Sequence, residues 1–211
     1  MFAGTVSYLK WDEIVLALKG KRVAVLGARG VGKTHLVTFL TTGSIPPTYK
    51  QTVTPAKVPA RRFDLKELEL NVKDSLDVAG DKVAYAKWKE LVAGSDVVLY
   101  LLRADKVLKG DAAVEARVRQ DIKHIGEWLD GLKERPEFFI IGTHCDLAEG
   151  FPELAEDQIG DYVDKFTKLP IMSELFLRVG GASRVKVVIG SMKTIDHTEA
   201  LVYDTFAQVA S

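Results

Sequence analysis

The chain has 211 residues, 47% of them hydrophobic and 27% charged, and its 29 Lys and Arg residues balance 29 Asp and Glu residues. This length suits one domain with a sizeable core, and the neutral balance gives no overall electric field that favours nucleic acid or an anionic membrane as a partner. The one cysteine, Cys145, excludes a disulfide within the chain and has no Cys or His cluster around it that resembles a metal site, so we expect a reducing, cytoplasmic setting.

The segment ahead of the first expected strand carries apolar side chains close to a helical stripe, which predicts a helical extension over residues 1–19 before one main domain at 20–211. Its longest apolar run, residues 14–18, is too short for a secretory signal or a membrane span. Position 2 is Phe2 and the chain ends at Ser211 without a cysteine, so no lipid anchor is expected. The stripe leaves open whether the extension packs on the domain or binds a membrane surface or a partner.

Short apolar runs alternate with longer amphipathic segments along the rest of the chain, which predicts α/β architecture. Four runs are nearly continuously apolar, as expected of strands buried on both faces of a parallel sheet. A further run alternates apolar with polar residues, and with the segment before it predicts a hairpin at one sheet edge. The four buried strands are expected at residues 22–26, 97–102, 138–141 and 185–189, and the hairpin at 61–65 and 68–73.

Helices are expected between these strands, and capping residues mark several of their ends. Asp111 is a candidate N-cap for the longest helix, and either Asp196 or Thr198 for the last one. Gly180 and Gly181 predict a left-handed C-terminal cap for an apolar helix. The expected helices cover residues 33–41, 82–92, 112–132, 157–166, 171–179 and 198–209.

The stretch "GARGVGKT", residues 27–34, follows the first apolar strand and precedes the first helix, which is the context of a phosphate-binding P-loop. Its glycines let successive backbone N–H groups face one anion. In this pattern Lys33 bridges the β- and γ-phosphates, and the Thr34 hydroxyl has the spacing of a magnesium ligand. The sequence therefore predicts a bound nucleoside triphosphate.

Three later motifs narrow the choice of nucleotide. In "DVAG", residues 77–80, Asp77 can hold a water on the magnesium, and Gly80 leaves a backbone N–H close to the γ-phosphate. In "THCD", residues 143–146, the Asp146 carboxylate can accept hydrogen bonds from guanine N1–H and its exocyclic amine, which adenine lacks. The third motif, "SMK" at residues 191–193, offers a backbone N–H to the guanine carbonyl oxygen. Together they favour GTP over ATP.

With these motifs, residues 20–209 resemble the Ras-like small GTPases of the Ras, Rab and Arf type, and "THCD" also resembles the guanine motif of Roc-type GTPases. The resemblance implies a P-loop NTPase with a six-stranded, mostly parallel sheet flanked by helices, with GTP or GDP and Mg²⁺ at the carboxyl ends of the strands. It also implies protein partners: an effector, an exchange factor and an activating protein. Thr52, which lies 19 residues beyond Lys33, matches the first-switch threonine, with Thr48 and Thr54 as alternatives.

The roles that the resemblance implies fall into three groups. The nucleotide would be bound by Gly27, Gly30, Val31, Gly32, Lys33, Thr34, His35, Thr143, His144, Asp146, Leu147, Ser191, Met192 and Lys193. Magnesium would be held by Thr34, Thr52 and Asp77, and hydrolysis would depend on Arg29, Lys33, Thr52, Gly80 and Asp81.

Departures from the family pattern concern the chemistry most. Asp81 stands where the family usually has the glutamine that orients the attacking water, and Arg29 stands at a loop position that is often glycine. His144 replaces the usual lysine of the guanine motif. Residues 147–190 form a longer connection than in simple Ras-type domains, which is either a partner surface or an ordinary packing element.

Three functions are compatible with these patterns. The first is a GTP/GDP switch with slow hydrolysis, in which Tyr85 and Trp88 either contact an effector or pack on a neighbouring helix. The second is a scaffold that binds GTP but hydrolyses it negligibly, because of Asp81 and Arg29. The third, an ATP-using kinase or ATPase, shares the P-loop but leaves "THCD" unexplained.

Overall fold

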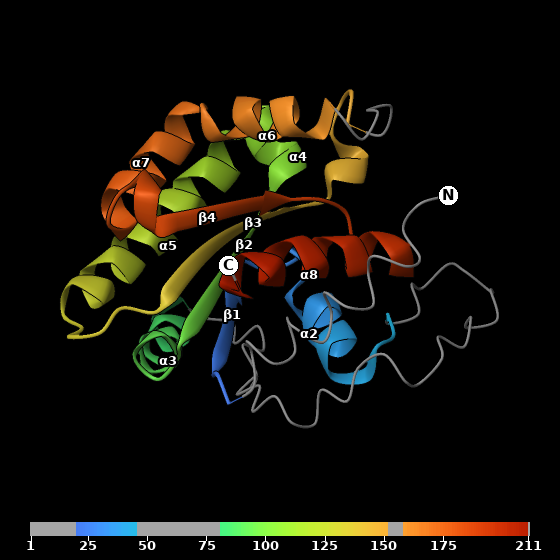
Figure 1. The fold of residues 1–211 in the computed structure, drawn as a ribbon. Coiled ribbons are helices and arrows are strands. Elements are labelled where there is room, and N and C mark those ends of the chain that lie inside the picture. The colour runs from blue at the N-terminus through green and yellow to red at the C-terminus, as the bar shows by residue number, and fades with distance from the viewer. Residues whose placement is uncertain (1–19, 46–80, 152–157, 211) are drawn as a thin grey trace.

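The computed structural model describes residues 20–45, 81–151 and 158–210 (Figure 1). Four parallel strands lie in this described part, in the spatial order β1-β2-β3-β4. The α/β class and the parallel sheet are therefore confirmed, while the N-terminal extension and the hairpin expected within residues 61–73 lie outside the described residues. The strands are β1 (Val23–Gly27), β2 (Val97–Arg103), β3 (Glu137–Thr143) and β4 (Val185–Ile189).

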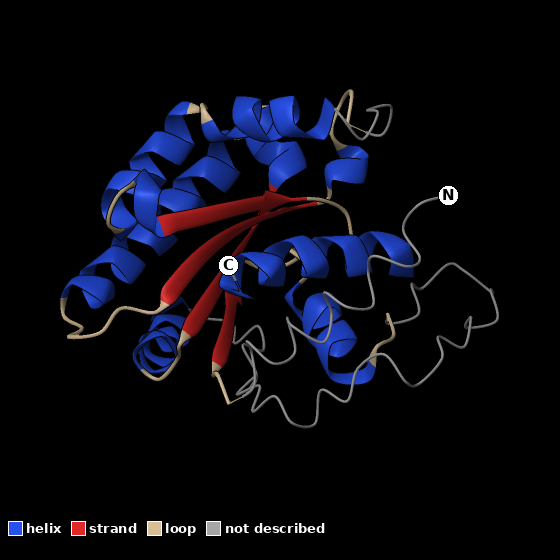
Figure 2. Cartoon of the chain, viewed as in Figure 1, coloured by secondary structure: helices blue, strands red, loops and turns tan. Residues whose placement is uncertain are grey.

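Helices cover both faces of the sheet (Figure 2). One face carries α2 (Lys33–Thr42) and α8 (Ile195–Ala210). The opposite face carries five helices, which include one short helix that the sequence did not predict. These are α3 (Asp81–Ala93), α4 (Ala104–Leu108), α5 (Ala112–Asp130), α6 (Ile159–Thr167) and α7 (Pro170–Val179).

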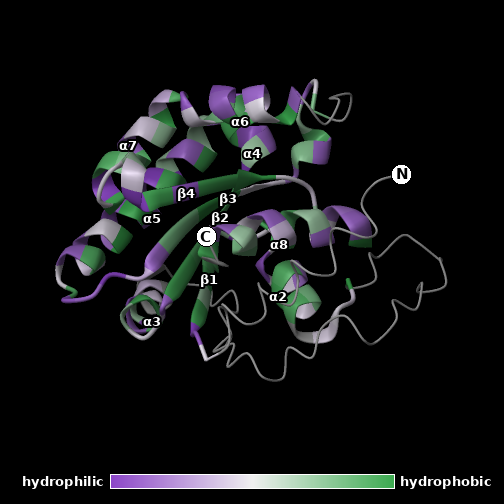
Figure 3. Ribbon diagram, viewed as in Figure 1, coloured by the Kyte–Doolittle hydropathy of each residue, from purple (hydrophilic) through white to green (hydrophobic). Residues whose placement is uncertain are grey.

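The sheet is buried between these two helical layers. Alternate residues of β2 face opposite sides: Tyr100 packs with the layer that contains α5, whereas Leu99 and Leu101 pack with the layer of α2 and α8. All three side chains are at most 1% exposed. Figure 3 shows the strands as predominantly hydrophobic, which explains why their sequences are continuous apolar runs and not alternating ones.

Two of the three predicted helix caps are confirmed, and one is wrong. Asp111 caps α5, accepting hydrogen bonds from the backbone N–H groups of two first-turn residues at 3.2 Å. Gly180 ends α7 in a left-handed conformation with φ of 109°. The last helix, however, begins earlier than expected, because the Thr194 hydroxyl accepts the His197 N–H at 3.2 Å. Thr194, and neither Asp196 nor Thr198, therefore supplies the N-terminal cap.

A buried polar cluster joins α3 to α5 and to the sheet. Asp121, which has no exposed surface, accepts hydrogen bonds from the hydroxyls of Tyr85 at 2.6 Å and Tyr100 at 3.0 Å, and from the Arg117 guanidinium at 2.8 Å. Burial raises the pKa of Asp121. Tyr85 and Trp88 are at most 9% exposed, so they pack against the neighbouring helices and do not form an exposed effector surface.

The described part of the long connection between β3 and β4 packs against the rest of the domain. α7 buries an apolar stripe against α5, and the helices approach closely, since a Cβ atom on Gly126 would lie 2.5 Å from the carbonyl oxygen of Arg178. The packing interpretation of this connection is therefore confirmed for α7. Within the described residues, no helix has both the length and the apolar character needed to cross a membrane.

Candidate nucleotide-binding site

Three of the predicted motifs meet at the carboxyl ends of the strands. "GARGVGKT" runs from the end of β1 into α2, "THCD" begins at the last residue of β3, and "SMK" follows β4. Parallel strands place these ends at one edge of the sheet, where α/β proteins bind their ligands. The fourth motif, "DVAG", lies outside the described residues, as do Thr52, Asp77 and Gly80. The structure therefore brings together the expected base-binding and phosphate-binding segments.

The phosphate loop has the backbone conformation that its glycines predict. Gly27, Gly30 and Gly32 have φ values of 138°, 75° and 93°, in the region that disfavours side chains. A Cβ atom on Gly27 would lie 2.3 Å from the carbonyl oxygen of Leu101, so the loop also needs glycine for its close approach to β2. A larger residue in place of Gly27 or Gly32 would distort the loop.

The loop leads directly into α2, whose first residues are the expected phosphate and magnesium ligands. The Gly32 carbonyl accepts the Leu36 N–H at 2.9 Å, which starts the helix at Lys33. The Lys33 ammonium donates to the Ala28 carbonyl at 2.7 Å and so lies back over the loop. Thr34 is exposed beside it. The positive end of the α2 dipole and the Lys33 charge therefore act on the same space.

Thr143 ties the guanine motif to the phosphate loop. Its buried hydroxyl lies 3.0 Å from the carbonyl oxygens of both Val31 and Leu102, and it donates to one of them at a time. Its oxygen also lies 2.8 Å from His144 Nδ1. Since the hydroxyl proton is used by a carbonyl, the His144 Nδ1–H is the donor in this last contact. A single side chain thus fixes the distance between the two motifs.

Replacing this hydroxyl by a methyl group, in Thr143→Val, should lower the free energy of unfolding by about 1–3 kcal/mol, because a buried carbonyl loses its partner. Urea unfolding measures this loss. The matched control is Thr205→Val, since Thr205 is also buried but donates within α8, to the Leu201 carbonyl at 2.7 Å. Only Thr143→Val should also weaken nucleotide binding; equal nucleotide affinities of the two variants would contradict the bridging role of Thr143.

Asp146 is held in place by the third motif. The Ser191 hydroxyl donates to Asp146 Oδ1 at 2.8 Å and accepts the Lys193 N–H at 3.0 Å. The strand ends around them are aligned, because the Cys145 N–H donates to the Gly190 carbonyl at 3.1 Å. Ser191 therefore orients the carboxylate that the sequence predicts to read guanine, a role of this serine that the sequence analysis did not foresee.

Met192 and Leu147 complete the described surroundings of the site. A Cβ atom on Gly32 would lie 2.3 Å from Met192 Cε, so this methionine covers the last glycine of the phosphate loop. Leu147 follows Asp146 in a short 3-10 turn and is 53% exposed. Cys145 in the same turn is fully buried, and burial raises the pKa of its thiol to about 12. This cysteine is therefore a packing residue and not a nucleophile.

Two half-buried histidines belong to the site. His144 adopts a left-handed backbone with φ of 60°, the one such residue other than glycine within the described ranges. Burial lowers the pKa of both His35 and His144, and the Arg103 guanidinium lowers that of His144 further. His35 Nε2 is buried without a hydrogen-bond partner among the described residues. Both rings are therefore neutral near pH 7.

Acidification should weaken the fold around these histidines. A histidine whose folded pKa lies below its ordinary value of 6.5 contributes stability above that value, and this contribution is lost as the pH falls through the folded pKa. Urea unfolding between pH about 7.5 and about 5 should show this loss for the wild type. The variant His35→Gln with His144→Asn should lose less stability over this range, and identical pH profiles would contradict the assignment. Asn suits position 144 because it tolerates the left-handed backbone.

An ion pair at the end of β2 adds residues that the sequence analysis missed. Arg103 donates two hydrogen bonds to Asp105, at 2.7 and 2.6 Å, and Asp105 is only 3% exposed. The positive charge of Arg103 also interacts with Asp146 and with His144. The clue in the sequence is the pair of opposite charges, Arg103 and Asp105, at the carboxyl end of an apolar strand.

Comparisons with known proteins agree with this geometry. No known family model matches the sequence, and no curated protein matches it either. Solved structures do match. Toc33 from Arabidopsis thaliana in complex with Mg²⁺ and GMPPNP aligns with a TM-score of 0.57 and 16% identity, covering 98% of this chain and 91% of that chain.

Two further structures come from other organisms. An ADP-ribosylation factor-like GTP-binding protein, the small COPII coat GTPase Sar1 from Encephalitozoon cuniculi in complex with GDP, aligns with a TM-score of 0.54 and 15% identity, covering 96% of this chain and 84% of that chain. A GTP-binding protein from the archaeon Sulfolobus solfataricus in complex with GDP gives 0.52 and 16%, covering 94% of this chain and 54% of that chain. At these identities the likeness establishes the fold: the chain has the Ras-like fold of small P-loop GTPases.

Proposed function

We propose that the protein is a guanine-nucleotide-binding switch that hydrolyses GTP slowly to GDP and phosphate with the help of Mg²⁺. The observation that carries this proposal is the convergence of the phosphate loop, Thr143, Asp146 and Ser191 at one edge of the sheet. A phosphate loop alone is compatible with any nucleoside triphosphate. A carboxylate fixed by a serine from the next strand selects guanine.

Base selection follows from the hydrogen-bonding capacity of Asp146. Ser191 occupies Oδ1 and fixes the plane of the carboxylate, which retains enough lone pairs to accept the N1–H and the 2-amino group of guanine. Adenine offers neither donor, so binding it would leave the carboxylate unpaired. Sites built on such polar groups reject the wrong ligand by about 10⁴-fold or more.

The phosphates are assigned to the loop and to the start of α2. Backbone N–H groups of the glycine-rich loop face the anion, and Lys33 adds a point charge. Mg²⁺ would be held by the Thr34 hydroxyl and by Thr52 and Asp77, which lie outside the described residues; the ion would neutralise charge that develops on the transferred phosphoryl group. An exposed hydroxyl directly after Lys33 fits this role.

Two residues are expected to set the rate of hydrolysis. Asp81 begins α3 at the position where the family pattern has the water-orienting glutamine, and its negative charge would repel the γ-phosphate of a bound GTP. Arg29 lines an apolar cavity of about 200 Å³ between the phosphate loop, β2 and α5. In a complex with GTP, Arg29 would either crowd the attacking water or supply positive charge to the transition state, a contribution that is worth about 10³ to 10⁵ in rate when an arginine is well placed.

Removal of magnesium tests the proposal. Chelation of Mg²⁺ by EDTA should accelerate release of fluorescent GDP by at least about tenfold, because a bound Mg²⁺ would neutralise the phosphates and Thr34 would help to hold it. Stopped-flow fluorescence measures the release rate, and Ca²⁺-specific chelation serves as the control. Equal release rates with and without Mg²⁺ would contradict a magnesium-dependent switch.

The second candidate is a scaffold that binds GTP without hydrolysing it, and the charge of Asp81 favours it. Single-turnover conversion of preloaded GTP separates the two functions, since a switch forms GDP and a scaffold keeps GTP. Asp81→Gln then tests the cause. A faster reaction in this variant would assign the slow rate to Asp81, whereas no gain would show that this position does not limit hydrolysis.

A further inference from the structure

The guanine motif of this chain lacks the cation that the family pattern places in it. His144 stands at the position of the usual lysine, and its ring is neutral near pH 7. Its Nδ1–H donates to Thr143, so its Nε2 carries a lone pair and no proton. The motif "THCD" therefore offers Asp146 no positive charge of its own.

Arg103 brings a positive charge to the same place from the neighbouring strand. It is the last residue of β2 and lies level with Thr143, the last residue of β3, in the parallel register. Its charge interacts with both Asp146 and His144. Burial lowers the pKa of His144 most, and the Arg103 guanidinium lowers it next, by more than the Asp105 carboxylate raises it. The positive end of the ion pair therefore lies toward the guanine motif.

Asp105 holds the guanidinium in this position. Arg103 donates two hydrogen bonds to it, and Asp105 itself is buried in α4. The Arg103 side chain is 26% exposed, and its other N–H groups make no hydrogen bond with a residue in the described ranges. The guanidinium is therefore fixed by one partner and still partly open at the carboxyl edge of the sheet.

Asp146 needs a nearby positive charge when a base covers it. Ser191 donates to one of its oxygens at 2.8 Å, and guanine would add two donors while it removes water from the carboxylate. Taking an ionised carboxylate out of water is costly unless an opposite charge lies near, and without one the group binds a proton. A protonated Asp146 would face guanine with a donor in place of an acceptor.

We propose, on the basis of the guanine site proposed above, that Arg103 is a positioning residue for Asp146 and takes over the charge of the lysine that the family has at position 144. The guanidinium keeps the carboxylate ionised while the base covers it, and Asp105 fixes the place of the guanidinium. The cation of the base site thus comes from β2 and not from the motif after β3. A lysine at position 144 should therefore be able to substitute for Arg103.

The test measures GDP affinity of the full chain by isothermal titration calorimetry. Arg103→Gln with Asp105→Asn removes the cation without leaving a buried carboxylate unpaired, and should weaken GDP binding by about tenfold. His144→Lys added to this pair of changes should restore the affinity. His144→Lys alone should not improve on the wild type, because the new charge would repel Arg103. The cost of a lysine in the left-handed backbone at this position is common to both backgrounds and cancels.

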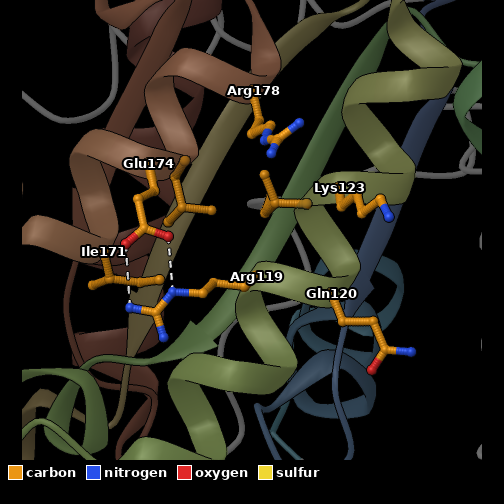
Figure 4. Close-up of a pocket in the computed structure, with 8 residues that line it drawn as sticks. Arg119, Gln120, Lys123, Ile171, Glu174 and Arg178 are labelled. Atoms are coloured by element: carbon orange, nitrogen blue, oxygen red, sulfur yellow. Dashed lines mark hydrogen bonds and ion pairs between the residues drawn. The ribbon is translucent and has the colours of Figure 1, made fainter.

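The matched control is another ion pair with two hydrogen bonds, which lies between α5 and α7. Figure 4 shows this pair, in which Arg119 donates to Glu174 at 2.8 and 3.2 Å. Arg119→Gln with Glu174→Gln should leave GDP binding unchanged, and a loss equal to that of the Arg103 variant would overturn the proposal.

Two further outcomes would also overturn it. One is wild-type GDP affinity in Arg103→Gln with Asp105→Asn, and the other is the same effect of His144→Lys in both backgrounds, which would show that the two positions act independently. GDP binding by the wild type tests the proposed function, whereas the differences among these variants test the role of Arg103. Failure of this proposal is therefore distinguishable from failure of the proposed function.

Discussion

Asp146→Asn should raise the dissociation constant for GDP by about 10² to 10⁴-fold, because each of two hydrogen bonds to a charged acceptor contributes about 1.5–3 kcal/mol. The asparagine side chain has nearly the same shape and can still accept from Ser191, so the fold should be preserved. Its amide nitrogen, however, would face the guanine donors. Isothermal titration calorimetry measures the loss.

A second nucleotide makes this prediction specific to the base. Xanthosine diphosphate carries a carbonyl oxygen where guanine has its amino group, and the asparagine amide can donate to that oxygen. We therefore expect Asp146→Asn to prefer the xanthine nucleotide, in reverse of the wild type. Asp164→Asn, which changes an exposed carboxylate on α6, is the matched control. A variant at position 146 that binds GDP as tightly as the wild type would show that this carboxylate does not read the base.

Lys33→Ala should weaken GTP binding by at least about 30-fold, since truncating one partner of a hydrogen-bonded charge pair costs about 2 kcal/mol or more. The fold itself should lose only about 1 kcal/mol, the usual net contribution of one hydrogen bond such as that from Lys33 to Ala28. Fluorescent GTP titration and urea unfolding measure the two effects separately.

Guanosine serves as the internal control for this variant, because it has the base but no phosphates. Its affinity should be the same for the wild type and for Lys33→Ala. Lys109→Ala, which truncates an exposed lysine outside the site, should change neither affinity. An equal loss of guanosine and GTP binding would indicate a disturbed site and would argue against a direct contact of Lys33 with phosphate.

Local patterns predicted the parts of the site that lie within one segment. The phosphate loop depends on glycines that are close in sequence, and Gly27, Gly30 and Gly32 have the positive φ values that such a loop requires. The buried strands followed from their continuous apolar runs, and the Asp111 cap from its place before a helical pattern. In each case the deciding interactions are formed by neighbouring residues.

Local sequence patterns could not predict the hydrogen bonds between segments that are far apart in the sequence. The hydrogen bond from Ser191 to Asp146 joins residues 45 positions apart, and that from Thr143 to Val31 spans 112. Both depend on how the sheet aligns its strand ends. The short helix α4 was missed because its five residues are too few for a periodic pattern. The cap of α8 was assigned wrongly because Thr194 competes with two equally suitable residues within one turn.

We propose that the fixed carboxylate of Asp146 makes this a guanine-nucleotide site. Competition of unlabelled GTP, GDP and ATP against a fluorescent GTP analogue, in excess Mg²⁺, tests it most directly. We expect GTP and GDP to displace the analogue at concentrations at least about 10⁴-fold lower than ATP does. Displacement by ATP at concentrations similar to those of GTP would contradict the claim and would assign the phosphate loop to an adenine-nucleotide enzyme.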